Sequence, residues 1–310
     1  MNNFGRFMNN IFSKLLFRVV FFFLPQSVCF EGFASMQNPG VEKNQSFVIG
    51  EMTGQLGNQL FVVAAASALA WDNNAEAYFP TLISPTEIYK HVFFRCKLVV
   101  PNIPIDYIWQ EPRYGYDSIP FCSNMQIRGY FQSEKYFVHH REKILQLLAP
   151  SFKDMTYFRK KYDWLIQHPN TVGVQLRYYY LEIPGATDYM QYGMDYLEKA
   201  MSLFPEDSLF VVTTNNVEHT RKSMPKWAKN VVFLEEPHYM CLHLQSLCKH
   251  NIISNSTFGW WGAWLNKNPN KIVVCPSAWM NGLDVSDTIP QEWIQIDAKY
   301  ECPTEFPPSK

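Results

Sequence analysis

The segment ISNSTFGWWGAWL, residues 253–265, places three tryptophans within five residues, directly after a run of small polar side chains. Interpreted as the end of a strand followed by a helix, it puts Ser256 or Thr257 at the N-cap, where a hydroxyl can bond a free backbone N–H. The tryptophans then recur at i, i+1 and i+4 and would pack the helix against its neighbours. Two interpretations fit. The segment is an ordinary capped helix with an aromatic core face, or its first turn binds an anion through unpaired donors and partial positive charge.

The second half of the chain alternates apolar strands with helices. The predicted strands are 171–177, 208–216, 230–236, 251–255 and 271–279, and the predicted helices are 194–204, 240–250 and 256–266. This alternation is typical of parallel sheets with right-handed crossovers, which bind ligands at the carboxyl ends of their strands. Polar residues stand at those ends: Arg177, Thr213 to Asn216, Glu235, Glu236, and Asn255 to Thr257.

Arg177 is the candidate for binding an anion at such a strand end. It directly follows an apolar strand, and an arginine there can clamp a phosphate with two parallel hydrogen bonds. The alternative is a surface ion pair, for example with Glu182. Glu51, Glu182, Asp188 and His250 also lie near predicted strand ends and are candidates for a general base by residue type and place alone.

The folded part begins with a strand, a glycine turn and a helix. The strand is predicted at 46–52, the turn has the sequence GQLGNQ, residues 54–59, and the helix covers 59–71. The glycines either let a ligand approach the backbone closely or simply connect the two elements. The turn lacks the third glycine of the dinucleotide-binding fingerprint.

Residues 75–150 give a weaker pattern of short aromatic runs broken by prolines. We expect a strand and turn at 125–133 and a helix at 136–150, which ends at a proline. With these elements the chain divides into a segment 1–45, an amino-terminal lobe 46–165 and a carboxyl-terminal lobe 166–310.

Composition narrows the function classes. The 310 residues carry a net charge of −1 and no basic stripe, so a nucleic-acid partner is not expected. Seven scattered cysteines form no C-x-x-C pair, which gives no support for a zinc site. They are typical of buried thiols, with one or two disulfides as the alternative.

The first 45 residues differ from the rest of the chain. Lys14 and Arg18 precede the short apolar run 19–30, as in a secretory signal or a signal anchor, and a start of translation at Met36 is the competing interpretation. We therefore expect membrane association through this segment. A secreted or a cytoplasmic protein is the alternative.

Three motifs together resemble the α-1,2-fucosyltransferases of glycosyltransferase family 11. They are the turn GQLGNQ at 54–59, the block CKHNIISNSTFGWWGAWLNKNPNKIVVCPSAWM at 248–280, and the P-x-x-W from Pro290 to Trp293. The resemblance implies an α/β protein of the GT-B type, with two Rossmann-like lobes built on parallel sheets. It also implies inverting transfer of fucose from GDP-fucose to a galactose-type hydroxyl of a glycan, in α-1,2 linkage. No metal or other cofactor is implied, and the sequence contains no Asp-x-Asp triplet.

The resemblance also assigns roles to residues. The donor partners are implied to be Asn58, Arg177, Thr214, Asn215, Ser256, Thr257 and Phe258. Arg177 would contact the diphosphate, the segment 256–258 would present hydroxyl and backbone donors to it, and Asn58 would face the cleft between the lobes.

Two motifs depart from the family. The family's H-x-R-R-G-D reads QLRYYY here, residues 175–180, and its F-S-D-D reads TTNN, residues 213–216. Only the first arginine of the former motif survives, as Arg177. Glu182 or Asp188 could replace the lost carboxylate, so the predicted catalytic residues are Arg177, Glu182 and Asp188. The departures leave two further alternatives: the same fold with another donor or acceptor, or a non-catalytic protein that binds nucleotides or glycans.

Overall fold

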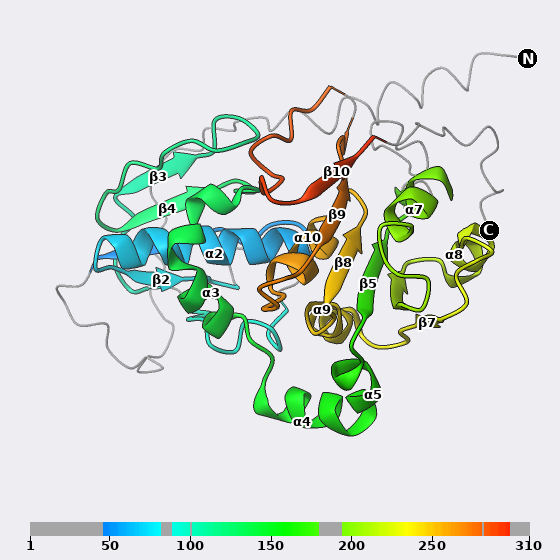
Figure 1. Ribbon diagram of the computed structural model, residues 1–310. Helices are drawn as coiled ribbons and strands as arrows, with labels where there is room; N and C mark the ends of the chain where they lie inside the picture. The colour runs from blue at the N-terminus through cyan, green and yellow to red at the C-terminus, as the bar shows by residue number, and fades with distance from the viewer. Residues whose placement is uncertain (1–45, 82–88, 100, 180–193, 281, 298–310) are drawn as a thin grey trace, which may run out of the picture. The chain divides into compact units, whose positions relative to one another are not determined.

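A computed structural model describes residues 46–81, 89–99, 101–179, 194–280 and 282–297 (Figure 1). The predictions for Glu182, Asp188 and the segment 1–45 lie outside these residues. Among the described helices, none combines the length and the apolar character needed to cross a membrane.

The first sheet has four parallel strands in the order β2-β1-β4-β3. Its strands are β1 (Phe47–Gly50), β2 (Glu76–Tyr78), β3 (Tyr107–Gln110) and β4 (Met125–Arg128). Helix α2 (Leu56–Asp72) follows β1, and 13 of its 17 residues are buried. A helix that is buried on most of its faces belongs inside a core rather than on a surface. Packing on one sheet alone therefore does not account for α2.

The second sheet has six parallel strands in the order β10-β9-β8-β5-β6-β7. They are β5 (Thr171–Leu176), β6 (Leu209–Thr214), β7 (Val231–Phe233), β8 (His250–Ile253), β9 (Val273–Pro276) and β10 (Ile294–Ile296). The helices that alternate with them are α7 (Met194–Met201), α8 (Val217–Ser223), α9 (His238–Ser246) and α10 (Thr257–Trp264). The predicted α/β fold with two parallel sheets is confirmed.

A helical stretch joins the two sheets. It consists of η1 (Glu134–Tyr136), η2 (Val138–His140), α3 (Arg141–Leu147), α4 (Phe152–Lys161) and α5 (Asp163–Gln167). The helix predicted for 136–150 is therefore wrong in its first part, where two 3₁₀ turns replace it. Phe137, between those turns, has φ −146° and ψ −2°, which is not helical, and its ring is fully buried. Burial of this ring overrides the local helical pattern.

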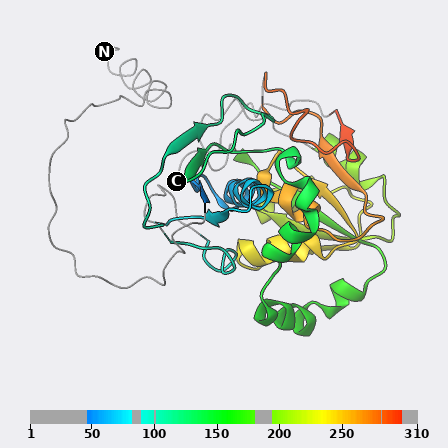
Figure 2. The same ribbon diagram turned by 90° about the vertical axis from the view of Figure 1, so that its left-hand side faces the viewer.

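Helix α10 packs against its neighbours through its tryptophans, as its sequence predicted, and it also joins the cores of the two sheets. Trp260 and Trp261 are fully buried, and their rings lie 4.5 and 5.1 Å from that of Phe61 on α2. Phe137 stacks on Trp261 at 5.4 Å. Figures 1 and 2 show α2 and α10 side by side, with the two sheets on either side of the pair. The second face of α2 is thus covered by α10, and one hydrophobic cluster spans both sheets.

Candidate functional site: a cleft at the carboxyl ends of the strands

A cleft of about 300 Å³ lies where the carboxyl ends of both sheets meet. From the second sheet it is lined by the last residues of β5 and β6 and by residues that follow β5, β6, β7 and β8, and from the first by Gln55 and the first turn of α2. The lining residues are Gln55, Leu56, Gly57, Tyr89, Gln175, Leu176, Arg177, Thr213, Thr214, Asn215, Leu234, Glu236, His238, Cys241, Ser256, Thr257 and Phe258. Six of the seven residues predicted to bind the donor are in this set, and the seventh, Asn58, is not.

Arg177 is the first residue after β5 and is half-buried at the cleft. Its backbone N–H donates to Ser254 Oγ at 3.2 Å, which ties the end of β5 to the end of β8. Its guanidinium carbon lies 4.6 Å from the centre of the Tyr179 ring, a cation–π contact. The strand ends and this ring together hold a cationic group at the wall of the cleft.

The first turn of α10 forms the adjoining wall. Ser256 is the N-cap, but its hydroxyl makes no capping hydrogen bond. The interpretation of this segment as an ordinary capped helix is therefore wrong in this respect. Ser256 is fully buried, and its Oγ has no hydrogen-bond partner within the described residues. Thr213 Oγ1, also in the cleft lining, is in the same situation. Unpaired buried hydroxyls are costly and uncommon, so these two are well suited to bonding with a ligand.

The glycine turn approaches α10 closely. Gly54 has φ +66°, a conformation that suits glycine, and Gly57 lies in the first turn of α2. A Cβ on Gly57 would come within 2.5 Å of both the Phe258 backbone nitrogen and Thr257 Oγ1. The glycine therefore lets the amino ends of α2 and α10 meet at the cleft.

Asn58 bridges the two sheets beside the cleft rather than lining it. Its Oδ1 accepts hydrogen bonds from Thr257 Oγ1 at 3.0 Å and from Gln132 Nε2 at 3.1 Å. The Thr257 hydroxyl is thus already engaged. The contact that Thr257 and Phe258 offer to a ligand comes mainly from their backbone at the start of α10.

Three side chains of the TTNN segment, residues 213–216, form hydrogen bonds within the fold. Asn215 Oδ1 accepts from the Tyr178 backbone N–H at 3.0 Å, and its Nδ2 donates to the Tyr178 carbonyl at 3.0 Å. Asn216 caps α8 by accepting from His219 N–H at 2.8 Å. Thr214 Oγ1 lies 2.8 Å from Thr220 Oγ1 and accepts from the Asn216 N–H. The side chains of Thr214, Asn215 and Asn216 thus bond to neighbouring parts of the fold at the edge of the cleft.

The altered QLRYYY motif is also packed into the fold. Gln175 is 5% exposed, and its Oε1 accepts from Ser254 Oγ at 3.0 Å. Tyr179 donates its hydroxyl to the Asn255 carbonyl at 3.1 Å. Tyr178 joins the hydrophobic core of the second sheet, where burial raises the pKa of its hydroxyl. The residues around Arg177 thus fix the backbone of the cleft wall.

Glu236 is a cleft residue to which the sequence assigned no role. Its side chain is 7% exposed, and its Oε1 accepts from Tyr162 Oη at 2.6 Å, Lys161 Nζ at 2.7 Å and Tyr157 Oη at 2.8 Å. Burial by itself raises the pKa of this carboxyl, but these three donors lower it below its usual value. Glu236 is the one acidic residue among the described residues that line the cleft, and its three hydrogen-bond donors favour the ionised form.

Glu51 and His250, two of the four candidates for a general base, have hydrogen-bond partners outside the cleft. Glu51 Oε2 pairs with Arg128 Nε at 2.7 Å and accepts from Gln126 Nε2 at 2.5 Å. His250 begins β8, and its Nδ1 accepts from the Ile272 N–H at 2.9 Å. Both side chains hold neighbouring strands or segments together and are outside the described lining of the cleft.

The sequence pattern of the family "Glycosyl transferase family 11" matches residues 103–297. This chain belongs to glycosyltransferase family 11. It is 31% identical over 193 residues to the O-antigen biosynthesis glycosyltransferase WbnK of Escherichia coli, covering 54% of this chain and 59% of the relative. It is 24% identical over 294 residues to an α-1,2-colitosyltransferase of the same organism, covering 81% and 99%.

A mammalian relative and a solved structure complete the comparison. Galactoside α-(1,2)-fucosyltransferase 2 of Oryctolagus cuniculus is 28% identical over 239 residues, 68% of this chain and 65% of the relative. The chain thus spans somewhat less than two thirds of WbnK and of this enzyme. The NodZ α-1,6-fucosyltransferase soaked with GDP-fucose aligns with a TM-score of 0.49 and 13% identity, over 72% of this chain and 93% of that one.

Proposed function

We propose that this family 11 chain transfers fucose from GDP-fucose to a galactose-type hydroxyl of a glycan, in α-1,2 linkage and with inversion at the anomeric carbon. The names of two relatives support the linkage, because both specify α-1,2 transfer. The observation that carries the proposal is the presence of Arg177 and the uncapped first turn of α10 in one cleft. A guanidinium and a helix amino end are the groups that bind a diphosphate.

In the proposed reaction the acceptor oxygen bonds to the anomeric carbon as the bond from that carbon to the diphosphate breaks. GDP leaves with the electron pair, and the hydroxyl proton passes to a base, for which Glu182 and Asp188 are the proposed candidates. Negative charge grows on the diphosphate as the sugar becomes oxocarbenium-like. Arg177, the α10 N–H groups and the Ser256 hydroxyl would stabilise that charge from fixed positions. We propose that these groups suffice without a metal ion or another cofactor.

A second candidate function keeps the reaction and changes the sugar. The relative that matches over 81% of this chain is named for transfer of colitose rather than fucose. Gln175, Leu176 and Arg177, the first three residues of the motif that departs from the family, line the same cleft. The third candidate is a binding protein without turnover, because Tyr178 and Tyr179 now occupy buried positions where the family has charged and small residues.

Arg177→Ala tests the proposal. The assay follows release of GDP from GDP-fucose by the full chain, with either lactose or N-acetyllactosamine as the acceptor. Loss of a fixed charge at a developing anion lowers turnover by about 10²- to 10³-fold in comparable oxyanion sites. Arg177→Lys should recover only part of the rate, because an ammonium lacks the bidentate geometry of a guanidinium. Arg159→Ala, on the exposed face of α4, is the matched control and should leave the rate unchanged.

The outcomes separate the three candidates. GDP release that requires both acceptor and Arg177 supports the transferase. Arg177-dependent binding of GDP, measured by calorimetry, without release from GDP-fucose favours another sugar donor or a binding protein. Wild-type turnover in Arg177→Ala contradicts the assignment of the diphosphate to this cleft.

We further propose that the chain associates with membranes through residues 1–45, with secretion or a cytoplasmic location as the alternatives. Fractionation of cells that express the full chain and a chain beginning at Met36 tests this. Equal partition of both forms into the soluble fraction would contradict the proposal.

A further inference from the structure

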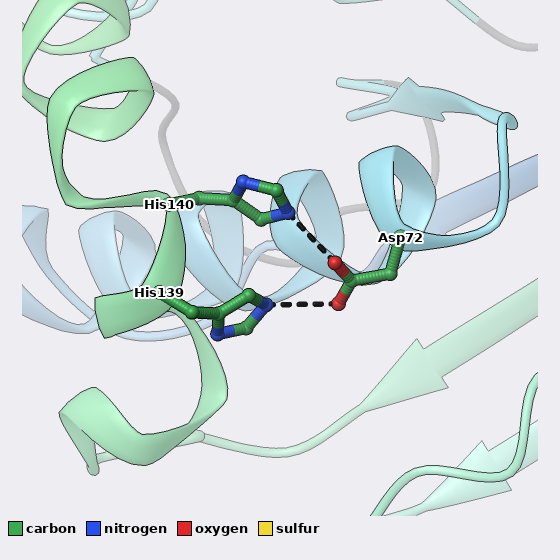
Figure 3. A group of neighbouring side chains, drawn as sticks. All are labelled: Asp72, His139 and His140. Carbon is green, nitrogen blue, oxygen red and sulfur yellow. Dashed lines mark hydrogen bonds and ion pairs between the residues drawn. The ribbon is translucent and has the colours of Figure 1, made fainter.

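Two histidines and an aspartate meet at the end of α2 that lies away from the cleft. Asp72 is the last residue of α2, and His139 and His140 are consecutive residues of η2. Figure 3 shows both imidazoles directed at the one carboxylate. His139 Nε2 lies 2.9 Å from Asp72 Oδ2, and His140 Nε2 lies 2.7 Å from Asp72 Oδ1. Asp72 and His139 are 67 residues apart in the chain, so the sequence alone does not show that they meet.

The cluster has the donor set of a metal centre. One ligand atom from each of the three residues can be chosen so that all lie within 4.8 Å of one another. Imidazole nitrogen and carboxylate oxygen are ligands of Zn²⁺, at about 2.0–2.2 Å, and three such ligands leave a fourth position for water. Two ligands on a tetrahedral ion stand about 3.3 Å apart at these bond lengths. In the structure the two imidazoles contact different oxygens of Asp72, at 2.9 and 2.7 Å, and the three ligand atoms lie within 4.8 Å of one another, so side-chain rotations bring them to these separations.

The surroundings favour a cation and allow that adjustment. The carboxyl end of a helix carries partial negative charge, and Asp72 ends α2. The Asp72 and His139 side chains are 41% and 47% exposed, so an ion can enter and the side chains can move. His140 is more enclosed, at 18%, and its ring lies edge-on to Trp71 at 5.3 Å. That contact holds one ligand in place while the other two adjust.

The cluster is separate from the candidate active site. Helix α2 has 17 residues, so its two ends stand about 24 Å apart at 1.5 Å per residue. The amino end, at Leu56 and Gly57, lines the cleft, whereas Asp72 is at the other end. An ion bound here would crosslink α2 to η2, and it would not contact a substrate in the cleft.

We propose that Asp72, His139 and His140 bind one divalent transition-metal ion of the zinc type, which stabilises the junction between α2 and η2. The proposal does not depend on the glycosyl transfer proposed above. It adds a structural metal centre to a protein whose sequence gave no support for one.

Binding of Zn²⁺ and Co²⁺ to the untagged full chain tests the proposal. Calorimetry with Zn²⁺ should show one ion per chain, and Co²⁺ should give the intense visible absorption of a four-coordinate site. Saturating Zn²⁺ should raise the melting temperature, because the ion binds the folded chain in preference to the unfolded one. Mg²⁺ should do neither, since it prefers oxygen ligands in octahedral geometry.

Variants connect the binding to these residues. His139→Ala removes an exposed ligand, and Asp72→Asn keeps the shape of the side chain; each should weaken Zn²⁺ binding at least about tenfold and abolish the cobalt spectrum. His91→Ala, an exposed histidine outside the cluster, should bind as the wild type does. Absence of saturable Zn²⁺ binding to the wild type would overturn the proposal. So would unchanged affinity and spectrum in both His139→Ala and Asp72→Asn.

Discussion

At its carboxyl end α10 is surrounded by side-chain donors, whereas at its amino end its own N-cap side chain makes no hydrogen bond. Lys271 Nζ donates to the carbonyls of Ala263 at 2.7 Å and Asn266 at 3.0 Å. Arg141 Nη2 donates to the Trp264 carbonyl at 2.8 Å, and its guanidinium lies 4.2 Å from the Trp264 ring. Two cations at a helix carboxyl end satisfy carbonyls that have no partner within the helix.

The difference separates the part of α10 that holds the fold from the part that is suited to a ligand. Both ends face largely buried surroundings, so solvent does not explain why one end is satisfied and the other is not. The end with unpaired donors is the end that lines the cleft. Variants along this one helix should therefore lose stability at its packed body and binding at its amino end.

The largest effect is expected from Trp260→Ala. Trp260 is fully buried against Phe61 and Trp293, and its Nε1 donates to the Thr288 carbonyl at 2.8 Å. Replacing a buried tryptophan by alanine leaves a cavity and lowers the free energy of unfolding by about 3–5 kcal/mol. Urea denaturation measures the loss. Trp164→Ala, at a 44% exposed position on α5, should cost less than about 0.5 kcal/mol. Similar small losses in both variants would show that α10 does not hold the two sheets together.

The strands of the second sheet could be predicted from the sequence better than those of the first. Strands β5, β6 and β9 are nearly continuous buried runs, and the polar residues begin where the strands end. That change of character was enough to place Arg177 and Ser256 at one edge. In contrast, β2 has three residues and β3 exposes three of its four, so neither has a recognisable apolar pattern.

The contacts that could not be predicted join residues far apart in the chain. Glu236 is held by Tyr157 and Tyr162, 79 and 74 residues earlier, in the helical stretch that joins the two sheets. Local patterns carry no information on such pairs. The same holds for the close approach of Gly57 to α10, since a glycine turn alone fits a plain strand-to-helix connection equally well.

A smaller effect, dependent on pH, is expected at the packed carboxyl end. Burial, together with the nearby Arg141, lowers the pKa of Lys271 to about 8 from its ordinary 10.5. Between these values the unfolded chain binds a proton that the folded chain has released, so rising pH favours the folded state at this site. The difference in unfolding free energy, wild type minus Lys271→Met, should therefore increase by about 1–3 kcal/mol from pH 8 to about 10.4.

Taking the difference removes the contribution of the buried thiols, which acts in the opposite direction. Burial raises the pKa of Cys248 and Cys275 to about 12, so their stabilisation is lost as the pH rises above the pKa of an unfolded thiol. These thiols are present in both proteins. A difference that stays flat across this range would mean that Lys271 keeps its proton, held by the α10 carbonyls.

The smallest change in stability, and the sharpest test of the comparison, is expected from Ser256→Ala. The Ser256 hydroxyl is buried with no hydrogen-bond partner among the described residues, so its removal takes no bond from the fold. The free energy of unfolding should change by less than about 0.5 kcal/mol, or rise slightly, because an unpaired buried polar group is itself costly. A typical N-cap serine, in contrast, costs about 1 kcal/mol when it is replaced by alanine. Affinity for GDP should nevertheless fall about ten- to hundredfold, the worth of one hydrogen bond to a charged ligand. Calorimetric titration with GDP and urea denaturation measure the two quantities on the same protein.

Ser202→Ala is the matched control, because that exposed serine donates to the Lys199 carbonyl at 2.8 Å and lies away from the cleft. A Ser256→Ala protein that loses more than about 1 kcal/mol of stability and keeps its affinity for GDP would place this hydroxyl among the groups that hold the fold. The two ends of α10 would then be satisfied alike, and the cleft would lose one of the donors assigned to the diphosphate.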